Sequence, residues 1–72
     1  MLKENFMTEN ELIKKFIEKR KEKGLSQKAI AEKLNTKQQN ISRIEKGLVS
    51  PSLKGFISML ECIDEELTIK EK

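Results

Sequence analysis

Apolar residues recur at helical spacing near the start of the chain. Three of them stand at positions i, i+3 and i+4, which places them on one face of an α-helix. They are Ile13, Phe16 and Ile17. Thr8 and Glu11 have the spacing of an N-terminal capping box, and Gly24 is the residue type that most often follows a last helical turn. The pattern predicts a helix over residues 9–23, preceded by an N-terminal arm at residues 1–7.

A shorter apolar pattern follows. Ser26 is a favourable N-cap residue. Three apolar residues after it are expected in the core: Ile30, Ala31 and Leu34. Asn35 accepts a left-handed backbone conformation more readily than most residues other than glycine. The sequence therefore predicts a helix over residues 27–34 that ends in a tight turn at Asn35.

The third predicted helix carries its apolar residues on one side only. Thr36 and Gln39 have the spacing of a second capping box, and Gly47 is expected to end the helix. Ile41 and Ile44 fix the direction of the core. At about 100° per residue, four polar side chains then point away from the core, and two more lie on the flanks. The outward residues are Gln39, Ser42, Arg43 and Lys46, and the flanking ones are Gln38 and Asn40.

The last third of the chain changes its pattern once. After a loop at residues 48–51, five residues predict a long apolar stripe on a fourth helix: Leu53, Phe56, Ile57, Leu60 and Ile63. Beyond Asp64, residues 67–70 alternate apolar and polar, as in a short strand. A lone strand needs a partner, and the same strand of a second copy is the economical one. We expect one all-α domain over residues 1–72 with a strand at residues 66–70 that pairs across a dimer; a disordered tail is the alternative.

Positive charge is concentrated in the middle of the chain. The formal net charge is only +3. Residues 12–54 hold 12 Lys and Arg against 4 Asp and Glu, residues 1–11 hold 1 against 3, and residues 55–72 hold 2 against 5. A clustered basic surface is the electrostatic condition for binding phosphates. A solvated, lysine-rich surface without a nucleic-acid partner is the competing interpretation.

The composition excludes several kinds of chemistry. The chain has no His and a single Cys, so we expect neither a disulfide nor a zinc site, and Cys62 is expected to be a buried structural thiol. No paired nucleophile and base and no glycine-rich phosphate loop are present, so we expect no catalytic residues, no cofactor and no enzyme. No apolar run is long enough for a signal peptide or a membrane span, which indicates a cytoplasmic protein with no role at a membrane.

The polar side of the third helix has side chains that can read DNA. A Gln side chain can make paired hydrogen bonds to adenine and an Arg side chain to guanine in the major groove, whereas Lys37 and Lys46 suit phosphates. Glu45 falls at the core edge of this helix, and Arg20 falls within the apolar face of the first helix. Since buried charges need partners, we expect Arg20 and Glu45 to form an ion pair.

These segments resemble the helix-turn-helix of the Cro/phage-repressor family, also called the XRE family. The residues that carry the resemblance are GLSQ (24–27), IAEKL (30–34), TKQQNISRIEKG (36–47) and PSL (51–53). The resemblance implies a bundle of four or five helices with the helix-turn-helix at residues 26–47. It also implies a homodimer that binds palindromic double-stranded DNA. Asn35 departs from the family, which most often has Gly at this turn.

The resemblance also implies roles for individual residues. Base contacts fall to Gln38, Gln39 and Arg43, and Arg20 with Glu45 matches a structural ion pair. Contacts to the DNA backbone are expected from Gln27, Lys37, Asn40, Ser42 and Lys46. Residues 51–69 look like the last helix and terminal strand of HipB- and HigA-type antitoxins, which implies a toxin as a further partner. The leading hypothesis is a homodimeric, sequence-specific repressor, and the alternative is an interaction module whose main task is to neutralise that toxin.

Overall fold

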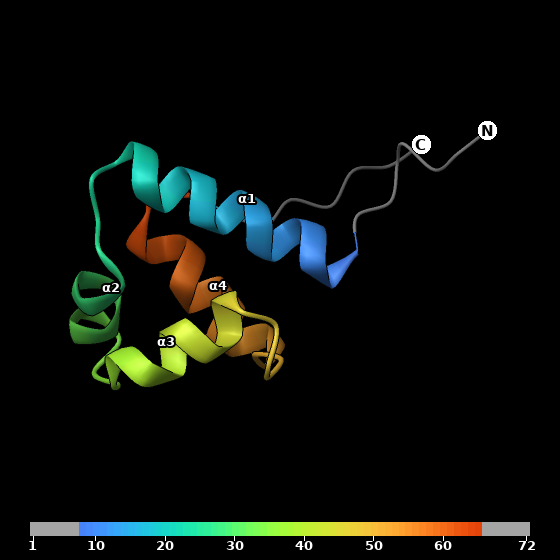
Figure 1. Ribbon diagram of the computed structural model, residues 1–72. Coiled ribbons are helices and arrows are strands. Elements are labelled where there is room, and N and C mark those ends of the chain that lie inside the picture. Colours follow the sequence, from blue (N-terminus) through green and yellow to red (C-terminus); the bar gives the residue numbers. More distant parts are fainter. Residues whose placement is uncertain (1–7, 66–72) are drawn as a thin grey trace.

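The computed structural model describes residues 8–65 of the chain. This part contains four helices. They are α1 (Glu9–Glu22), α2 (Gln27–Lys33), α3 (Gln38–Glu45) and α4 (Leu53–Cys62). In the view of Figure 1, α1 lies along one side, α3 along the opposite side, and α4 between them. The all-α architecture is confirmed for this part of the chain. The predicted arm at residues 1–7 and the predicted strand at residues 66–70 lie outside it.

Both ends of α1 follow from local sequence. The hydroxyl of Thr8 accepts a hydrogen bond from the backbone N–H of Glu11 at 3.1 Å, and the Glu11 carboxylate accepts one from the backbone N–H of Thr8 at 2.8 Å. This is the predicted capping box. At the other end, Gly24 has φ +72°, a left-handed conformation that a residue without a Cβ adopts without strain.

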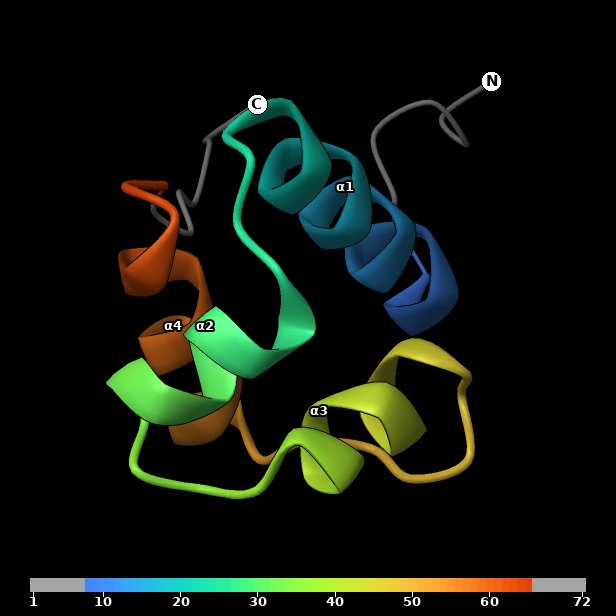
Figure 2. The ribbon, with the colours of Figure 1, turned by 60° about the vertical axis from the view of Figure 1, so that its left-hand side comes forward.

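The end of α2 also matches its prediction. The Ser26 hydroxyl caps the helix by accepting a hydrogen bond from the N–H of Ala29 at 3.0 Å. Leu34 is the C-cap residue. Asn35 follows with φ +57° and so makes the left-handed turn expected of it. The turn sends the chain directly into α3, as Figure 2 shows.

The predicted capping box at Thr36 is wrong. The N-cap of α3 is Lys37, and no side chain caps this helix. The backbone N–H of Thr36 donates to the carbonyl of Ala31 at 2.9 Å, so Thr36 still belongs to the end of α2. Its hydroxyl instead accepts a hydrogen bond from the side-chain amide of Asn40 at 2.8 Å. The left-handed turn at Asn35 therefore moves the start of α3 one residue further than the sequence motif suggests.

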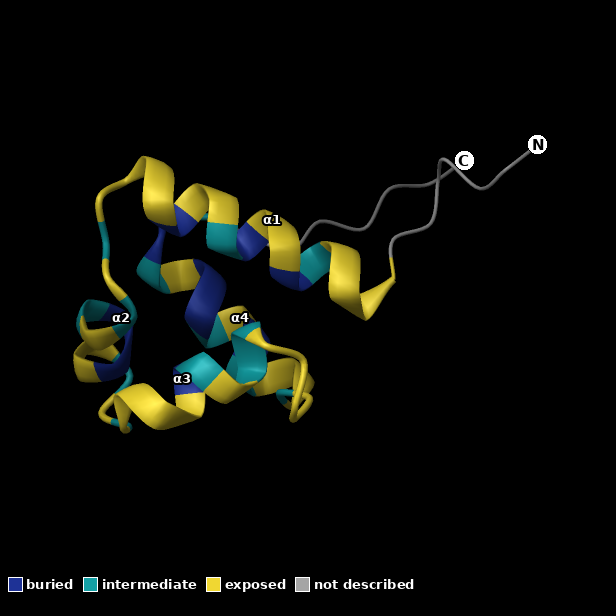
Figure 3. Ribbon diagram, viewed as in Figure 1, coloured by how far each residue is buried: buried dark blue, intermediate teal, exposed yellow. Residues whose placement is uncertain are grey.

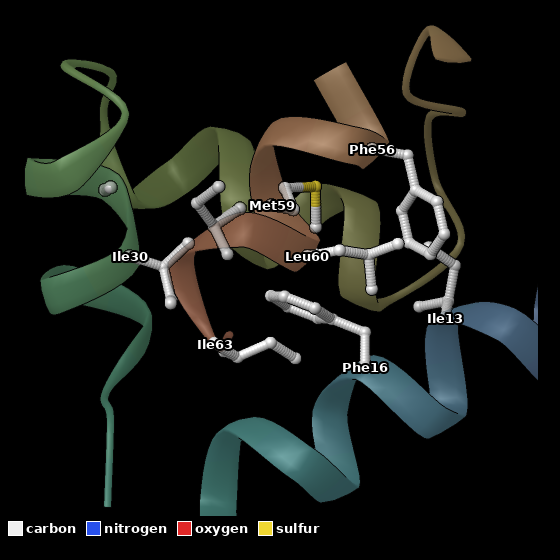
Figure 4. Packing of buried hydrophobic residues seen from close by; sticks show 9 residues of the cluster. Ile13, Phe16, Ile30, Phe56, Met59, Leu60 and Ile63 are labelled. Atoms are coloured by element: carbon white, nitrogen blue, oxygen red, sulfur yellow. The ribbon is translucent and has the colours of Figure 1, made fainter. Parts of the chain in front are cut away.

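Side chains from all four helices meet in one core, together with Ile63, the C-cap residue of α4. Figure 4 shows Phe16 of α1 lying against the side chains of α4, with Ile30 of α2 approaching from the other side. The buried apolar residues are Ile13, Phe16, Ile30, Ala31, Ile41, Phe56, Met59, Leu60 and Ile63. Ile17, Leu34 and Ile44 are only partly buried and pack against this core. Within residues 8–65, no helix has the length and apolar character needed to cross a membrane.

The predicted apolar stripe of α4 is wrong at two positions. Leu53 and Ile57 are 69% and 37% exposed, whereas Met59, absent from the predicted stripe, is 1% exposed. The buried positions of α4 are Phe56, Met59 and Leu60, and Ile63 just after the helix is buried as well, so these residues mark the side of α4 that faces the core. Leu53 and Ile57 lie beyond its edge. Figure 3 shows the exposed surface over the first turns of α4.

Substitutions at Asn35 test whether this residue has a left-handed backbone conformation. Because its φ is +57°, Asn35→Gly is expected to leave the free energy of unfolding almost unchanged, whereas Asn35→Ala should lower it by about 1 kcal/mol. Urea denaturation followed by circular dichroism measures both. A variant with Ala that is as stable as the one with Gly would contradict this conformation.

Candidate nucleic-acid interface

The outward side of α3 gathers four polar side chains from successive turns. Ile41, which is 2% exposed, holds the opposite side of the helix in the core. Gln39, Ser42, Arg43 and Lys46 line one shallow, wide-open hollow on the surface. Three of them are exposed, and Ser42 is half-buried. Their spacing of i, i+3, i+4 and i+7 explains why they share a face. The helix thus presents an unbroken polar surface to solvent.

The residues flanking this face are also exposed, but two of them have partners within the chain. Lys37, Gln38 and Asn40 are all exposed. One N–H of the Asn40 amide donates to the hydroxyl of Thr36 at 2.8 Å. The Gln38 amide nitrogen lies 3.5 Å from the Gln27 amide oxygen, a long hydrogen bond. The short bond holds the Asn40 amide in place at the N-terminal end of α3, whereas the long one constrains the Gln38 amide only weakly.

A buried ion pair connects α1 with the end of α3. The Arg20 Nε and Nη2 groups donate to the two carboxylate oxygens of Glu45 at 2.8 and 2.9 Å. A third donor, Nη1, bonds to the carbonyl of Leu25 at 2.9 Å. The side chains are 9% and 6% exposed. This two-point contact is the ion pair anticipated from the position of Arg20 on an apolar helix face, and it ties α3 to the rest of the fold.

Gln27 lies between the ion pair and the surface. Its amide nitrogen donates to Glu45 Oε1 at 2.8 Å, and its amide oxygen accepts the long hydrogen bond from Gln38. The sequence suggested only a DNA backbone contact for Gln27 and missed its bond to Glu45. Gln27 begins α2 and Glu45 ends α3, so only the angle between the two helices brings them together, and the sequence offers no signal for that angle.

Cys62 has no part in this surface. It is half-buried at the end of α4. Burial raises the pKa of its thiol above the ordinary value, and the positive charge of Lys33 opposes that shift only in part. The thiol therefore stays protonated at neutral pH. Among residues 8–65, no three His, Cys, Asp or Glu side chains lie close enough together to hold a metal ion.

Comparison with known proteins shows the family to which this chain belongs. Residues 16–69 match the helix-turn-helix family. The chain therefore belongs to the XRE (Cro/phage-repressor) type of helix-turn-helix protein, in agreement with the arrangement of α2, the turn at Asn35 and α3. The match covers most of the chain, including every residue of the surface described above.

The chain is also similar to a protein named as a transcriptional regulator. It is an uncharacterized HTH-type transcriptional regulator of Haemophilus influenzae, 38% identical over 58 residues. The alignment covers 81% of this chain and 59% of the relative, so this chain spans only part of that protein's length. No solved structure gives a significant match. Neither match bears on the likeness to HipB- and HigA-type antitoxins.

Proposed function

We propose that this protein is a sequence-specific DNA-binding transcriptional regulator, a homodimeric repressor that inserts α3 into the major groove of a palindromic operator. The observation that carries the proposal is the face of α3, on which Gln39, Ser42, Arg43 and Lys46 line one open hollow opposite the buried Ile41. The helix-turn-helix family of the chain agrees with this function, and so does its similarity to the Haemophilus protein that is named as an HTH-type transcriptional regulator.

The exposed side chains divide by chemistry into those that read bases and those that position the helix. Amide and guanidinium groups can make two hydrogen bonds to one base edge, so Gln38, Gln39 and Arg43 read the sequence in this proposal. Contacts to phosphates fix the position of α3 without reading sequence. That role falls to Lys37, Asn40, Ser42 and Lys46, and to the second amide N–H of Gln27, since its first is bonded to Glu45. Asn40 uses one N–H on Thr36 and keeps the other for a phosphate.

The Glu45 carboxylate sets the orientation of two amides in turn. An ionised carboxylate only accepts hydrogen bonds, so the nitrogen of the Gln27 amide must face it and the oxygen must face outward. That oxygen in turn accepts from the nitrogen of Gln38. Gln38 then keeps its carbonyl oxygen and one N–H for DNA, which is the acceptor and donor pair that matches adenine. We therefore assign adenine as the base that Gln38 reads.

Selection of bound duplexes from a random DNA library at physiological salt tests the function. An enriched inverted repeat with half-sites about one helical turn apart, roughly 34–36 Å, is the expected result. Binding without enrichment would mean that the basic residues supply only phosphate affinity. That outcome would contradict the proposal and favour a protein partner, such as a toxin, as the main target.

Replacement of Arg43 separates base reading from phosphate binding. Arg43→Ala is expected to weaken binding to the selected operator by about 1–3 kcal/mol and to relax the preference at one base pair. The exposed Lys46 supplies the control, because Lys46→Ala should weaken binding to all sequences alike and lower the salt slope by about 1. Titrations on operator and random duplexes at several salt concentrations measure both effects. An equal loss on the two duplexes for Arg43→Ala would contradict its base-reading role.

A further inference from the structure

A hollow lies between α1 and α4, at the place where the described part of the chain ends. Its volume is about 150 Å³. An apolar cavity of roughly that volume can hold a benzene-sized group, so there is room for a further apolar side chain. We call this hollow the α1–α4 groove. Its lining is mostly apolar and consists of Leu12, Phe16, Phe56, Leu60 and Ile63, with Lys15, Lys19 and Glu65 at its edges.

The two helices run in roughly the same direction along the α1–α4 groove. Near their first turns, Ile13 of α1 and Phe56 of α4 line a neighbouring hollow together. Further along, Phe16 and Ile63 share the groove itself, and Figure 4 shows the same order of side chains. Lys19 follows Phe16 by about one turn. Lys19 and Ile63 therefore mark the end of the groove at which the chain leaves α4.

The chain leaves α4 through a turn that brings it back to this groove. Asp64 has φ +59°, a left-handed conformation. The backbone N–H of Glu65 donates to the carbonyl of Leu60 at 2.9 Å, and that of Asp64 donates to the carbonyl of Glu61 at 3.1 Å. These are the two hydrogen bonds of a Schellman motif. Glu65 therefore lies beside the last turns of α4, where it is half-buried in the lining of the groove.

The residues that follow the described part of the chain have the spacing and length that the groove requires. Leu67 and Ile69 stand two positions apart, so in an extended chain both side chains point to one side. Four extended residues, 66–69, span about 13 Å. The groove is about 10 Å long, since Leu12 and Lys19 at its two ends are seven residues apart on α1. This segment is therefore long enough to reach from one end of the groove to the other.

Charge favours the same segment. Lys15 and Lys19 line the α1 side of the groove, and both are exposed. Lys19 also lies 3.9 Å from Glu22, but that contact is exposed and so contributes little. The chain enters the groove with two acidic residues in succession, Glu65 and Glu66. A positive edge thus meets the acidic start of the segment.

We propose that the α1–α4 groove is the docking site of this chain's own C-terminal segment, residues 66–72, with Leu67 and Ile69 seated between the two helices. The family match reaches residue 69, which agrees with a domain that continues past the end of α4. The docked segment closes the groove and joins α1 to α4. A strand that pairs across a dimer, as expected from the sequence, would leave this groove open. The inference goes beyond the proposed function, and no part of it requires DNA.

A disulfide between the groove and the segment tests where the segment lies. Cys62→Ala first removes the natural thiol. On that background, Lys15→Cys with Thr68→Cys is expected to form a disulfide within one chain about tenfold faster than Lys14→Cys with Thr68→Cys, because docking raises the local concentration of the two thiols. Thr68 lies between the two apolar residues of the segment and so points to the edge of the groove. Lys14 is exposed on the same helix but does not line the groove, which makes it the matched control.

Electrophoresis without reductant follows both pairs of cysteines over time and separates single chains from linked ones. Equal rates for the two pairs would show that the segment does not occupy the groove. Disulfides that link two chains, in place of disulfides within one, would assign the groove to the segment of a second copy. Either result would overturn the proposal.

Replacement of an apolar residue of the segment provides a second measurement. Leu67→Ser is expected to lower the folding equilibrium constant about tenfold, or about 1.4 kcal/mol, because its side chain loses apolar surroundings. Thr68→Ser at the next position is the control and should change that constant less than about twofold. The loss in Leu67→Ser should be the same at low and high protein concentration, since docking within one chain does not depend on concentration.

Urea denaturation followed by circular dichroism measures both variants at the two concentrations. A Leu67→Ser chain as stable as the parent chain would contradict the docking of the segment. A loss that changes with protein concentration would show that the segment contacts a second copy instead, and this would overturn the proposal as well.

Discussion

Replacing Glu45 with alanine is expected to lower the free energy of unfolding by about 3–5 kcal/mol, since it leaves a buried guanidinium without its counter-charge. Arg20 is 7% exposed and would keep only the carbonyl of Leu25 as an acceptor. A domain of this size has a total stability of roughly 4–11 kcal/mol. The variant should therefore lose a large share of the total stability. Urea denaturation followed by circular dichroism measures the loss.

The exposed ion pair of α1 provides the matched control for Glu45→Ala. Lys19 and Glu22 lie 3.9 Å apart, and both side chains are about half exposed or more. Glu22→Ala should change the free energy of unfolding by no more than about 0.5 kcal/mol. The double replacement of Arg20 by Met and Glu45 by Leu is expected to recover most of the lost stability, because no charge is then buried alone. Similar losses in Glu45→Ala and Glu22→Ala would contradict a special role for the buried pair.

Replacing Ile41 with alanine is the second change with a large expected effect, a loss of about 2–5 kcal/mol in the free energy of unfolding. Ile41 is 2% exposed and lies at the centre of the inward side of α3. Its removal leaves a cavity between α3 and the core. Because the same side chain holds α3 in place, and α3 is the helix that we propose reads DNA, binding to an operator found by selection should also weaken. Thermal unfolding and operator titration measure the two effects.

Ile44 supplies the comparison for Ile41. It lies one turn further along the same helix but is only partly buried, so Ile44→Ala should cost clearly less than Ile41→Ala. Both changes introduce the same residue at an interior helical position, so differences in helix propensity largely cancel. Equal losses at the two positions would show that α3 is anchored differently from the described packing.

Features that depend on neighbouring residues were predictable from the sequence. The capping box of Thr8 and Glu11 and the left-handed turn at Asn35 both rest on contacts within a few positions, and the structure contains them. The ion pair of Arg20 and Glu45 spans 25 residues. It could still be anticipated, because a charge on an apolar helix face requires an opposite charge inside the same small core.

Features that depend on how whole helices pack were not predictable. The sequence placed Leu53 and Ile57 on the buried stripe of α4 and overlooked Met59, because spacing gives the relative angles of side chains but not which side the neighbouring helices cover. The motif at Thr36 failed for a related reason, since the turn before it still belongs to α2. The bond from Gln27 to Glu45 likewise depends on the angle between α2 and α3.

The division of α3 into an inner and an outer side has a consequence for how such a protein can change during evolution. Among residues 8–65, the side chains of Gln39, Ser42, Arg43 and Lys46 take part in none of the hydrogen bonds that hold the fold together, whereas Glu45 and Ile41 on the other side anchor the helix. Substitutions at the outer positions, other than those to Gly or Pro, should therefore cost little in folding. In the proposed function, a gene duplicate could acquire a new DNA target through a few changes on this one face with little change in stability.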